Sequence, residues 1–171
     1  MPTDNLGVVR AGIVAFNRDG PEAILSFTDP QVVLEYQGVL IDQATVHRGR
    51  EEVRKLLMAS WEDFDELHVE IEESLEHGDS VILGLHVRAR GKASLVPVDL
   101  RPGHVMSLRD GIVFRWRICE SYDVALAAAG ARDGAPARRR TVRGRDARGS
   151  VLASTSDSML PAGIYRGRTR A

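Results

Sequence analysis

The stretch "HVMSLRDGIVFRWRICE", residues 104–120, decides the fold, because it has the pattern of two β-strands joined by a tight turn. A three-residue turn over residues 109–111, with Gly111 in the left-handed conformation, pairs Leu108 with Ile112. This register collects the apolar residues of both strands on one face. A two-residue turn would instead place apolar residues of the first strand beside arginines of the second. We therefore predict a hairpin with a three-residue turn and one apolar face.

Two ionisable side chains bracket this face, His104 at its beginning and Glu120 at its end. The face itself consists of Met106, Leu108, Phe114, Trp116 and Ile118. An imidazole whose pKa is near neutrality can act as a general acid or base. Partial burial beside aromatic rings would raise the pKa of the Glu120 carboxyl. The alternative is structural: His104 bonds backbone or solvent, and Glu120 caps a terminal helix or pairs with an arginine.

Alternation of apolar and polar residues over residues 67–90 predicts a second, longer hairpin upstream. A three-residue turn over residues 77–79 places Leu75 opposite Val81 and leaves Glu73 on the apolar face. On the polar face this register makes two cross-strand pairs, Glu70 with His86 and His68 with Arg88. A further strand over residues 95–100 contains a proline, which is typical of an edge or a bend near Asp99.

Helical spacing of apolar residues predicts helices over residues 6–20 and 50–64. Pro21 opens a second short helix, and the β-branched residues after it predict a strand over residues 31–37. A short Ala-rich helix over residues 122–129 ends at Gly130. The order of elements predicts an α+β domain over residues 1–130. Its cone-shaped, strongly curved, mostly antiparallel sheet, a cystatin-like α+β barrel, wraps around the helices and leaves room for a pocket.

The strand over residues 31–37 carries two candidate site residues on opposite faces. Glu35 shares one face with Val33, and Tyr36 lies on the other. Both faces contain apolar residues, so the alternation does not decide which of the two side chains lines the cone.

Charge divides the chain into two parts. Residues 1–130 hold 13 Lys and Arg against 21 Asp and Glu, a net charge of −8, whereas residues 131–171 hold ten Arg and three Asp, a net charge of +7. The second part has too few large apolar residues to offset its ordering entropy, which predicts a disordered, Arg-rich tail. Its basic run over residues 138–148 lacks interleaved aromatic residues, so we do not expect it to bind nucleic acid.

The chain has no apolar run long enough to span a bilayer and no secretory pattern in residues 1–20. Its single cysteine, Cys119, excludes an intramolecular disulfide and favours a reducing compartment. These features predict a cytoplasmic protein that is not associated with a membrane.

Four stretches resemble the nuclear transport factor 2-like superfamily, in particular its SnoaL-like and ketosteroid-isomerase-like members. They are "AFNRDGPEAILSFTDPQVVLEY" (15–36), "HRGREEVRKLL" (47–57), "EHGDSVILGLHVRARGK" (76–92) and "HVMSLRDGIVFRWRICESYDVALAAAG" (104–130). The resemblance covers nearly all of residues 5–130. It implies the fold but not the chemistry, because this fold hosts several kinds of enzyme as well as non-enzymatic binding subunits.

Ketosteroid isomerases use a carboxylate base and two oxyanion donors, a tyrosine and a protonated aspartic acid. The resemblance places Glu35 near the base and His104 at the aspartic acid, but only Gly12 or Ile13 at the tyrosine. Steroid isomerisation is therefore not expected, although an inward Tyr36 would replace the missing donor. SnoaL-type cyclases need an acid–base group beside a hydrophobic ligand. The resemblance implies three catalytic candidates, His104, Glu35 and Glu120, and six substrate-binding candidates, Tyr36, Trp61, Trp116, Phe16, Met106 and Asp99.

Two hypotheses follow for the function. The first is cofactor-free proton transfer (isomerisation, cyclisation or hydration) on a small hydrophobic carbonyl compound. The second is a non-catalytic ligand-binding or protein-interaction dimer of the same fold. No histidine or cysteine shows metal-ligand spacing, so neither hypothesis includes a metal or a cofactor. The resemblance also implies a homodimer that forms through the outer face of the sheet.

Overall fold

The structure, a computed structural model, describes residues 4–37 and 45–131. All of these residues belong to one compact unit. The predicted Arg-rich tail lies outside the described residues, except for Ala131. None of the described helices is long and apolar enough to cross a membrane.

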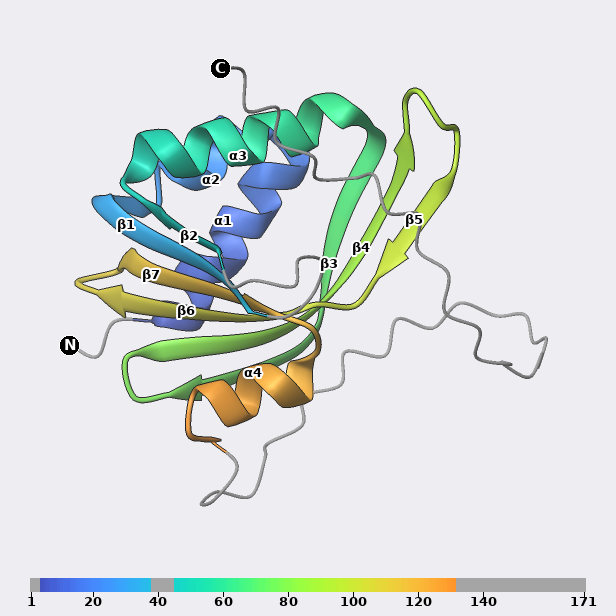
Figure 1. Ribbon diagram of the computed structural model, residues 1–171. Coiled ribbons are helices and arrows are strands. Elements are labelled where there is room, and N and C mark those ends of the chain that lie inside the picture. Colours follow the sequence, from blue (N-terminus) through green and yellow to red (C-terminus); the bar gives the residue numbers. More distant parts are fainter. Residues whose placement is uncertain (1–3, 38–44, 132–171) are drawn as a thin grey trace, which may run out of the picture. The chain divides into compact units, whose positions relative to one another are not determined.

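Seven strands form one open, strongly curved sheet (Figure 1). In chain order they are β1 (Thr28–Gln37), β2 (Thr45–Arg48), β3 (Phe64–His77), β4 (Ser80–Gly91), β5 (Pro97–Leu100), β6 (Gly103–Arg109) and β7 (Ile112–Cys119). Their spatial order is β2-β1-β7-β6-β4-β3, and β5 pairs with β4. Only β1 and β7 run parallel; every other pairing between the described strands is antiparallel. The α+β class and the curved, mostly antiparallel sheet are thus confirmed.

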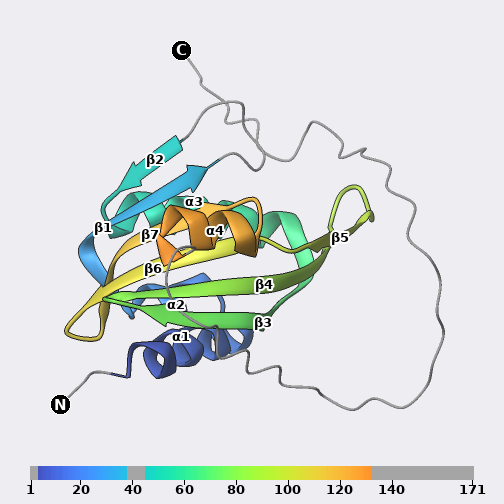
Figure 2. The ribbon, with the colours of Figure 1, turned by 90° about the horizontal axis from the view of Figure 1, so that it is seen from below.

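The helices lie on both sides of the sheet. They are α1 (Asn5–Asp19), α2 (Pro21–Leu25), α3 (Arg50–Asp63) and α4 (Tyr122–Ala128). The sheet curves around α1, α2 and α3, and α4 lies on the opposite side, as Figures 1 and 2 show. The first helix begins where Asp4 accepts a hydrogen bond from the Gly7 N–H at 2.8 Å, and it buries the apolar face that its spacing predicts. The second begins with Pro21, as expected.

Two boundaries differ from the sequence prediction. Strand β1 begins at Thr28, three residues before the predicted start. The strand tolerates Pro30 because the pairing of β1 with β7 is interrupted between Thr28 and Val33. Strand β2 is not among the elements predicted from the sequence. It has only four residues and lies at the edge of the sheet. None of its side chains is fully buried, so the sequence shows no clear alternation of apolar and polar residues there.

The predicted three-residue turn between β6 and β7 is wrong. Arg109 pairs with Ile112, so the turn contains only Asp110 and Gly111, both with positive φ (52° and 75°). This is the backbone that an Asp-Gly dipeptide favours in a two-residue hairpin. A bulge at Phe114 then restores the apolar face. Instead of Phe114, its neighbour Val113 joins the core.

The hairpin of β3 and β4 also has a shorter turn than predicted and a bulge that compensates for it. His77 pairs with Ser80 across a two-residue turn, whereas a turn of three residues was predicted. A bulge at Glu72 corrects the register, so Glu70 lies opposite His86 as predicted. The bulge also turns Glu73 outward, next to Gly84. Its predicted place on the apolar face is therefore wrong.

The two faces of the sheet bury two separate hydrophobic clusters. The larger lies between the sheet and α1–α3, and it includes the fully buried Val32, Leu34 and Leu83. The smaller lies under α4 and contains Ile82, Val105, Cys119 and Ala125. Cys119 thus lies on the convex side of β7, where α4 buries it.

Candidate binding site in the cone

The candidate site lies on the concave face of the sheet, where four strands bring their side chains into two adjacent rows. One row runs across Tyr36, Ile118, His104 and Leu83. The next row runs across Leu34, Trp116, Met106 and Val81. Residues in register on one face of a sheet lie about 5 Å apart. His104 is therefore a polar group set in a surface made mostly of large apolar side chains.

His104 is buried, with 8% of its surface exposed, and it bonds to its neighbour on β7. The Trp116 Nε1–H donates a hydrogen bond to His104 Nδ1 at 3.1 Å, and the two rings are tilted with centroids 5.7 Å apart. Because Nδ1 accepts, the neutral ring carries its proton on Nε2. Burial lowers the pKa of His104 from 6.5 to about 3. At neutral pH the ring is thus an uncharged hydrogen-bond donor and a poor base.

The aromatic residues predicted to bind substrate pack around this face. Trp116 and Met106 are buried, with 4% and 3% exposed surface. Phe16 on α1 meets Trp61 on α3 edge to face, with ring centroids 5.3 Å apart. The structure therefore brings all four predicted side chains to the concave side.

Tyr36 and Glu35 lie on opposite faces of the sheet, as alternation requires, and the structure shows which of the two faces the concave side. Tyr36 packs against the large cluster on the concave side. Glu35 lies on the convex face, where both of its carboxylate oxygens accept from Arg115 Nη2 at 3.0 Å. The proposed role of Glu35 as a catalytic base therefore has no support, because its carboxylate points away from the cone and is already paired.

Glu120 and Asp99 are also outside the cone. Strand β7 ends at Cys119, and the chain bends before α4, so Glu120 is exposed and does not follow the apolar face as predicted. Asp99 lies on β5 on the convex side. Its carboxylate contacts His86 at 3.0 Å and Arg101 at 2.9 Å. Its hydrogen bond with His86 holds the pKa of Asp99 below its ordinary value.

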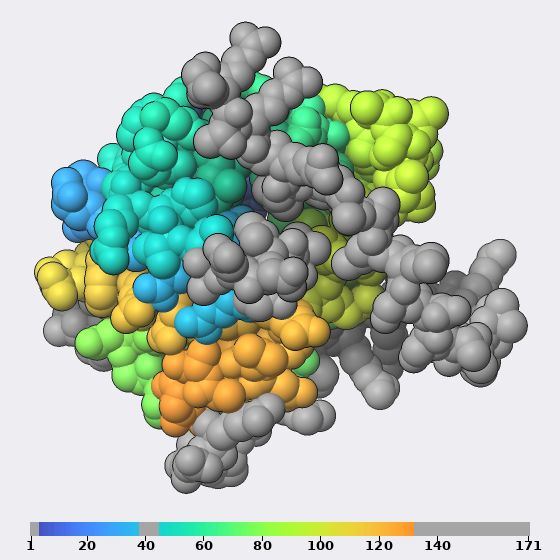
Figure 3. Space-filling model, viewed as in Figure 1, coloured from blue at the N-terminus to red at the C-terminus, as the bar shows by residue number. Residues whose placement is uncertain are grey.

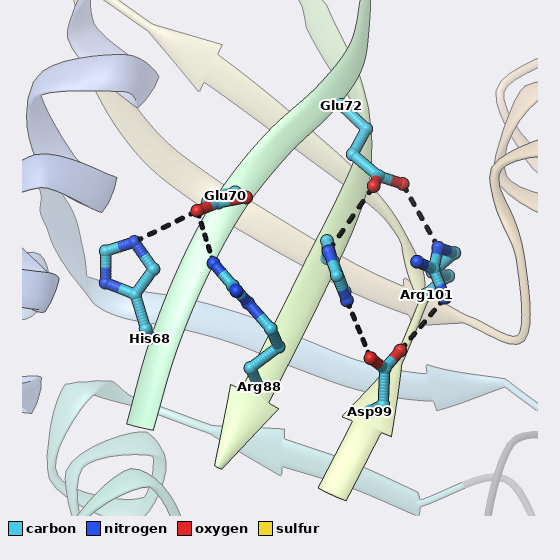
Figure 4. A network of polar contacts seen from close by, with 7 residues as sticks. His68, Glu70, Glu72, Arg88, Asp99 and Arg101 are labelled. Atoms are coloured by element: carbon cyan, nitrogen blue, oxygen red, sulfur yellow. Dashed lines mark hydrogen bonds and ion pairs between the residues drawn. The ribbon is translucent and has the colours of Figure 1, made fainter. Parts of the chain in front are cut away.

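Asp99 belongs to one of two groups of polar contacts on the convex face of β3, β4 and β5 (Figure 4). Arg101 joins Glu72 and Asp99, and Arg88 binds Glu70 at 2.6 Å. The predicted pairing of His68 with Arg88 is confirmed in the register. Dimerisation through this face stays a prediction. Among the described residues, no three carboxylate, imidazole or thiol groups lie close enough together to hold a metal ion.

The predicted pocket is nearly filled by side chains. A small cavity of about 10 Å³ lies on the concave side, which is about the space of one water molecule. It is lined by Val8, Val9, Gly12, Ile24, Phe27, Thr28, Met106, Val113 and Trp116. A ligand can therefore enter only if these side chains move. Met106 is suited to this, because an unbranched thioether adopts many rotamers.

Sequence reasoning did not identify Thr28 or Phe27 as cavity residues. They lie just before the predicted strand, and no periodic pattern covers the junction between α2 and β1. The resemblance did point to Gly12, which lines the cavity from α1.

Replacing Gly12 with alanine is expected to raise the free energy of unfolding by about 1 kcal/mol. The new Cβ would lie 3.6 Å from Ile24 Cγ1 and 3.7 Å from the Phe27 ring, at ordinary contact distances. Alanine also favours the helix. Urea unfolding at neutral pH measures the change, and a less stable variant would show that the cavity wall is tighter than the structure indicates.

Comparison with known proteins agrees with the fold. Residues 9–116 match the SnoaL-like domain family. No curated protein sequence matches the chain. Among solved structures, a putative SnoaL-like polyketide cyclase from Jannaschia sp. CCS1 is 19% identical, with a TM-score of 0.58 over 76% of this chain and 93% of that one.

Two further structures share the fold. A hypothetical protein from Catenulispora acidiphila, described with a ketosteroid isomerase-like fold and bound to trimethylamine, is 18% identical, with a TM-score of 0.58 over 75% of this chain and 97% of that one. An uncharacterised cystatin-fold protein from Novosphingobium aromaticivorans is 23% identical, with a TM-score of 0.56 over 68% and 97% of the two chains. At these identities the likeness establishes the fold alone. The family match covers more than half of the chain, and the protein belongs to the SnoaL-like domain family.

Proposed function

We propose that this protein binds a small apolar carbonyl compound inside the cone, and that His104 donates a hydrogen bond from Nε2 to the carbonyl oxygen. The observation that carries this proposal is the hydrogen bond from Trp116 to His104 Nδ1. It fixes which nitrogen of the buried ring holds the proton, so the donor of the neutral ring is Nε2–H. A buried donor of this kind is stabilised by a ligand that supplies an acceptor.

The cavity lined by Trp116, the hydrogen-bond partner of His104, matches the rest of such a ligand, although His104 itself is not among its lining residues. The cavity beside Trp116 has walls that are almost entirely apolar, and Thr28 and His104 are the only polar side chains buried within the described part of the chain. A pocket with apolar walls and a few polar groups is typical of sites for small organic molecules. Charged ligands are disfavoured, because no cationic or anionic group in the described cluster would compensate their desolvation.

Cofactor-free proton transfer on the same compound is the second candidate, and Tyr36 favours it. Tyr36 shares the row of His104 on the concave face, two strand spacings away, or about 10 Å between backbones. Two donors on one face could stabilise the oxyanion of an enolate. Neither Glu35 nor Glu120 reaches the cone, so the proton acceptor would be water or a group of the substrate.

A matched pair of probes tests the binding proposal: 1-tetralone and tetralin differ only in the carbonyl group. In a Trp61→Phe background, Trp116 is the only tryptophan, so its fluorescence reports on the cavity. We expect 1-tetralone to bind about fivefold more tightly than tetralin, because it gains one hydrogen bond from a neutral donor. The His104→Phe variant should bind the two probes equally.

Replacement of the exposed His77 by glutamine serves as the control and should keep the preference for 1-tetralone. Equal affinities in the parent, or no binding of either probe, would contradict the proposal. Deuterium exchange at the carbon next to the carbonyl of 1-tetralone, followed by NMR, separates catalysis from binding alone.

A further inference from the structure

A second hollow, of about 310 Å³, lies between the junction of α2 and β1, the first residue of α3 and the turn of β6 and β7. Figures 1 and 2 show these segments at the same edge of the sheet, and Figure 3 shows blue β1, cyan α3 and the gold turn close together on the surface. We call this hollow the arginine groove. Its lining residues are Ser26, Thr28, Asp29, Pro30, Arg50, Arg109, Asp110, Ile112 and Phe114.

Arg50 is fixed in the wall of the arginine groove but is not fully bonded. One of its terminal nitrogens, Nη2, donates to the backbone carbonyl of Thr28. Its Nε is buried and has no hydrogen-bond partner within residues 4–37 and 45–131. Buried guanidinium donors nearly always have an acceptor, so an unsatisfied one favours binding of a group that supplies an acceptor. The side chain is thus held in place while part of its donor capacity is unused.

Arg109 lies on the other wall, and it is held by an aromatic ring. Its guanidinium carbon lies 4.8 Å from the centre of the Phe114 ring. The bulge that turns Phe114 out of the core creates this contact. Other arginines of the domain form ion pairs with carboxylates, namely Arg18, Arg54, Arg88, Arg101 and Arg115. In the described part of the chain, neither Arg50 nor Arg109 forms such a pair.

The two carboxylates in the wall form no ion pair with these arginines among the described residues. Asp29 accepts a hydrogen bond from the Gln31 N–H at 2.7 Å, and Asp110 lies in the turn with positive φ. Neither makes an ion pair with a described side chain. Their negative charge would repel a large polyanion. A compact anion that lies between the two guanidinium groups would be repelled less.

We propose that the arginine groove binds one compact oxyanion, a carboxylate or a phosphate monoester, between Arg50 and Arg109. A guanidinium presents paired N–H donors that match the oxygens of either group. Helix α3 adds the N–H groups of its first turn, because Gly49 at its N-cap has no side chain to bond them; Glu51 and Glu52 in that turn offset part of the positive helix end. Phe114 and Ile112 offer apolar contact to the organic part of the ligand. This site is separate from the cone cavity, with which it shares only Thr28.

The test is a titration with inorganic phosphate and, separately, with benzoate, followed by ¹⁵N NMR of the arginine Nε–Hε signals. The signals of Arg50 and Arg109 are assigned by their loss in the Arg50→Lys and Arg109→Lys variants. We expect both signals to move with one saturating curve, while the signal of Arg10, exposed on α1, stays in place. The ligand that saturates first, phosphate or benzoate, identifies the natural chemistry.

Charge-matched variants complete the test. Arg109→Gln is expected to weaken binding tenfold or more, because it removes one half of a charge-assisted contact. Arg10→Gln removes the same charge elsewhere and should change the affinity less than twofold. Arg109 is exposed, so its variant should fold even if Arg50→Lys does not. If all three arginine signals move together, or if Arg109→Gln binds as Arg10→Gln does, the site does not exist.

Discussion

The Gly103→Ala variant is expected to lose about 3 kcal/mol of its free energy of unfolding, the upper end of the usual penalty for overpacking. An added Cβ would lie 2.1 Å from the Ser121 carbonyl oxygen and 2.7 Å from Ala125 Cβ. The first of these is backbone and cannot rotate away. The whole start of α4 would have to move, which would open the small cluster that buries Cys119. Urea unfolding with a constant m-value measures the loss.

Gly84 provides the matched control, because it pairs with Gly103 on the adjacent strand. An alanine Cβ there would lie 3.2 Å from Glu73 Cβ and 3.3 Å from Tyr122, which are side-chain atoms at the limit of contact. We expect Gly84→Ala to lose about 1 kcal/mol. If the two variants are equally stable, the close contact between α4 and β6 is not a main determinant of stability.

Acidification is expected to destabilise the protein through His104. The folded state holds this ring neutral with a pKa of about 3, whereas the unfolded chain binds a proton below about pH 6.5. The stability is therefore complete above pH 6.5 and falls as pH decreases toward 3. Each pH unit in that window costs about 1.4 kcal/mol. Between about pH 8 and about pH 5, the free energy of unfolding should fall by about 2 kcal/mol from this residue alone.

Urea unfolding at the two pH values in the His104→Leu variant isolates this effect. The variant has no ring to protonate, so its stability should fall by about 2 kcal/mol less than that of the parent. His77→Gln removes an exposed histidine from the turn and should behave as the parent does. An unchanged pH dependence in His104→Leu would mean that His104 is not held neutral, and it would also remove the basis for its role as a donor.

The concave site could be predicted only in part. Alternation places His104, Met106 and Trp116 on one apolar face of the hairpin, and the structure confirms this, because a strand gives successive side chains to opposite faces. The same rule extended this face to Glu120 and was wrong there. The strand ends one residue earlier, and a rule for extended backbone does not hold across a bend. For Glu35 and Tyr36 alternation predicts opposite faces but not which face is inside, since that depends on the pairing of β1 with β7.

The sequence by itself determined the family, the order of the elements and the apolar faces of the hairpins, because periodic burial leaves a periodic pattern along the chain. The tertiary structure alone decided the turn lengths and the bulges at Glu72 and Phe114. A shorter turn with one extra residue in the ladder gives almost the same inward face as a longer turn without it, so the hydrophobic pattern cannot distinguish them. The pairing between the strands determines which residue at such a bulge points away from the core. In this way Phe114 leaves the core and meets Arg109 at the wall of the arginine groove.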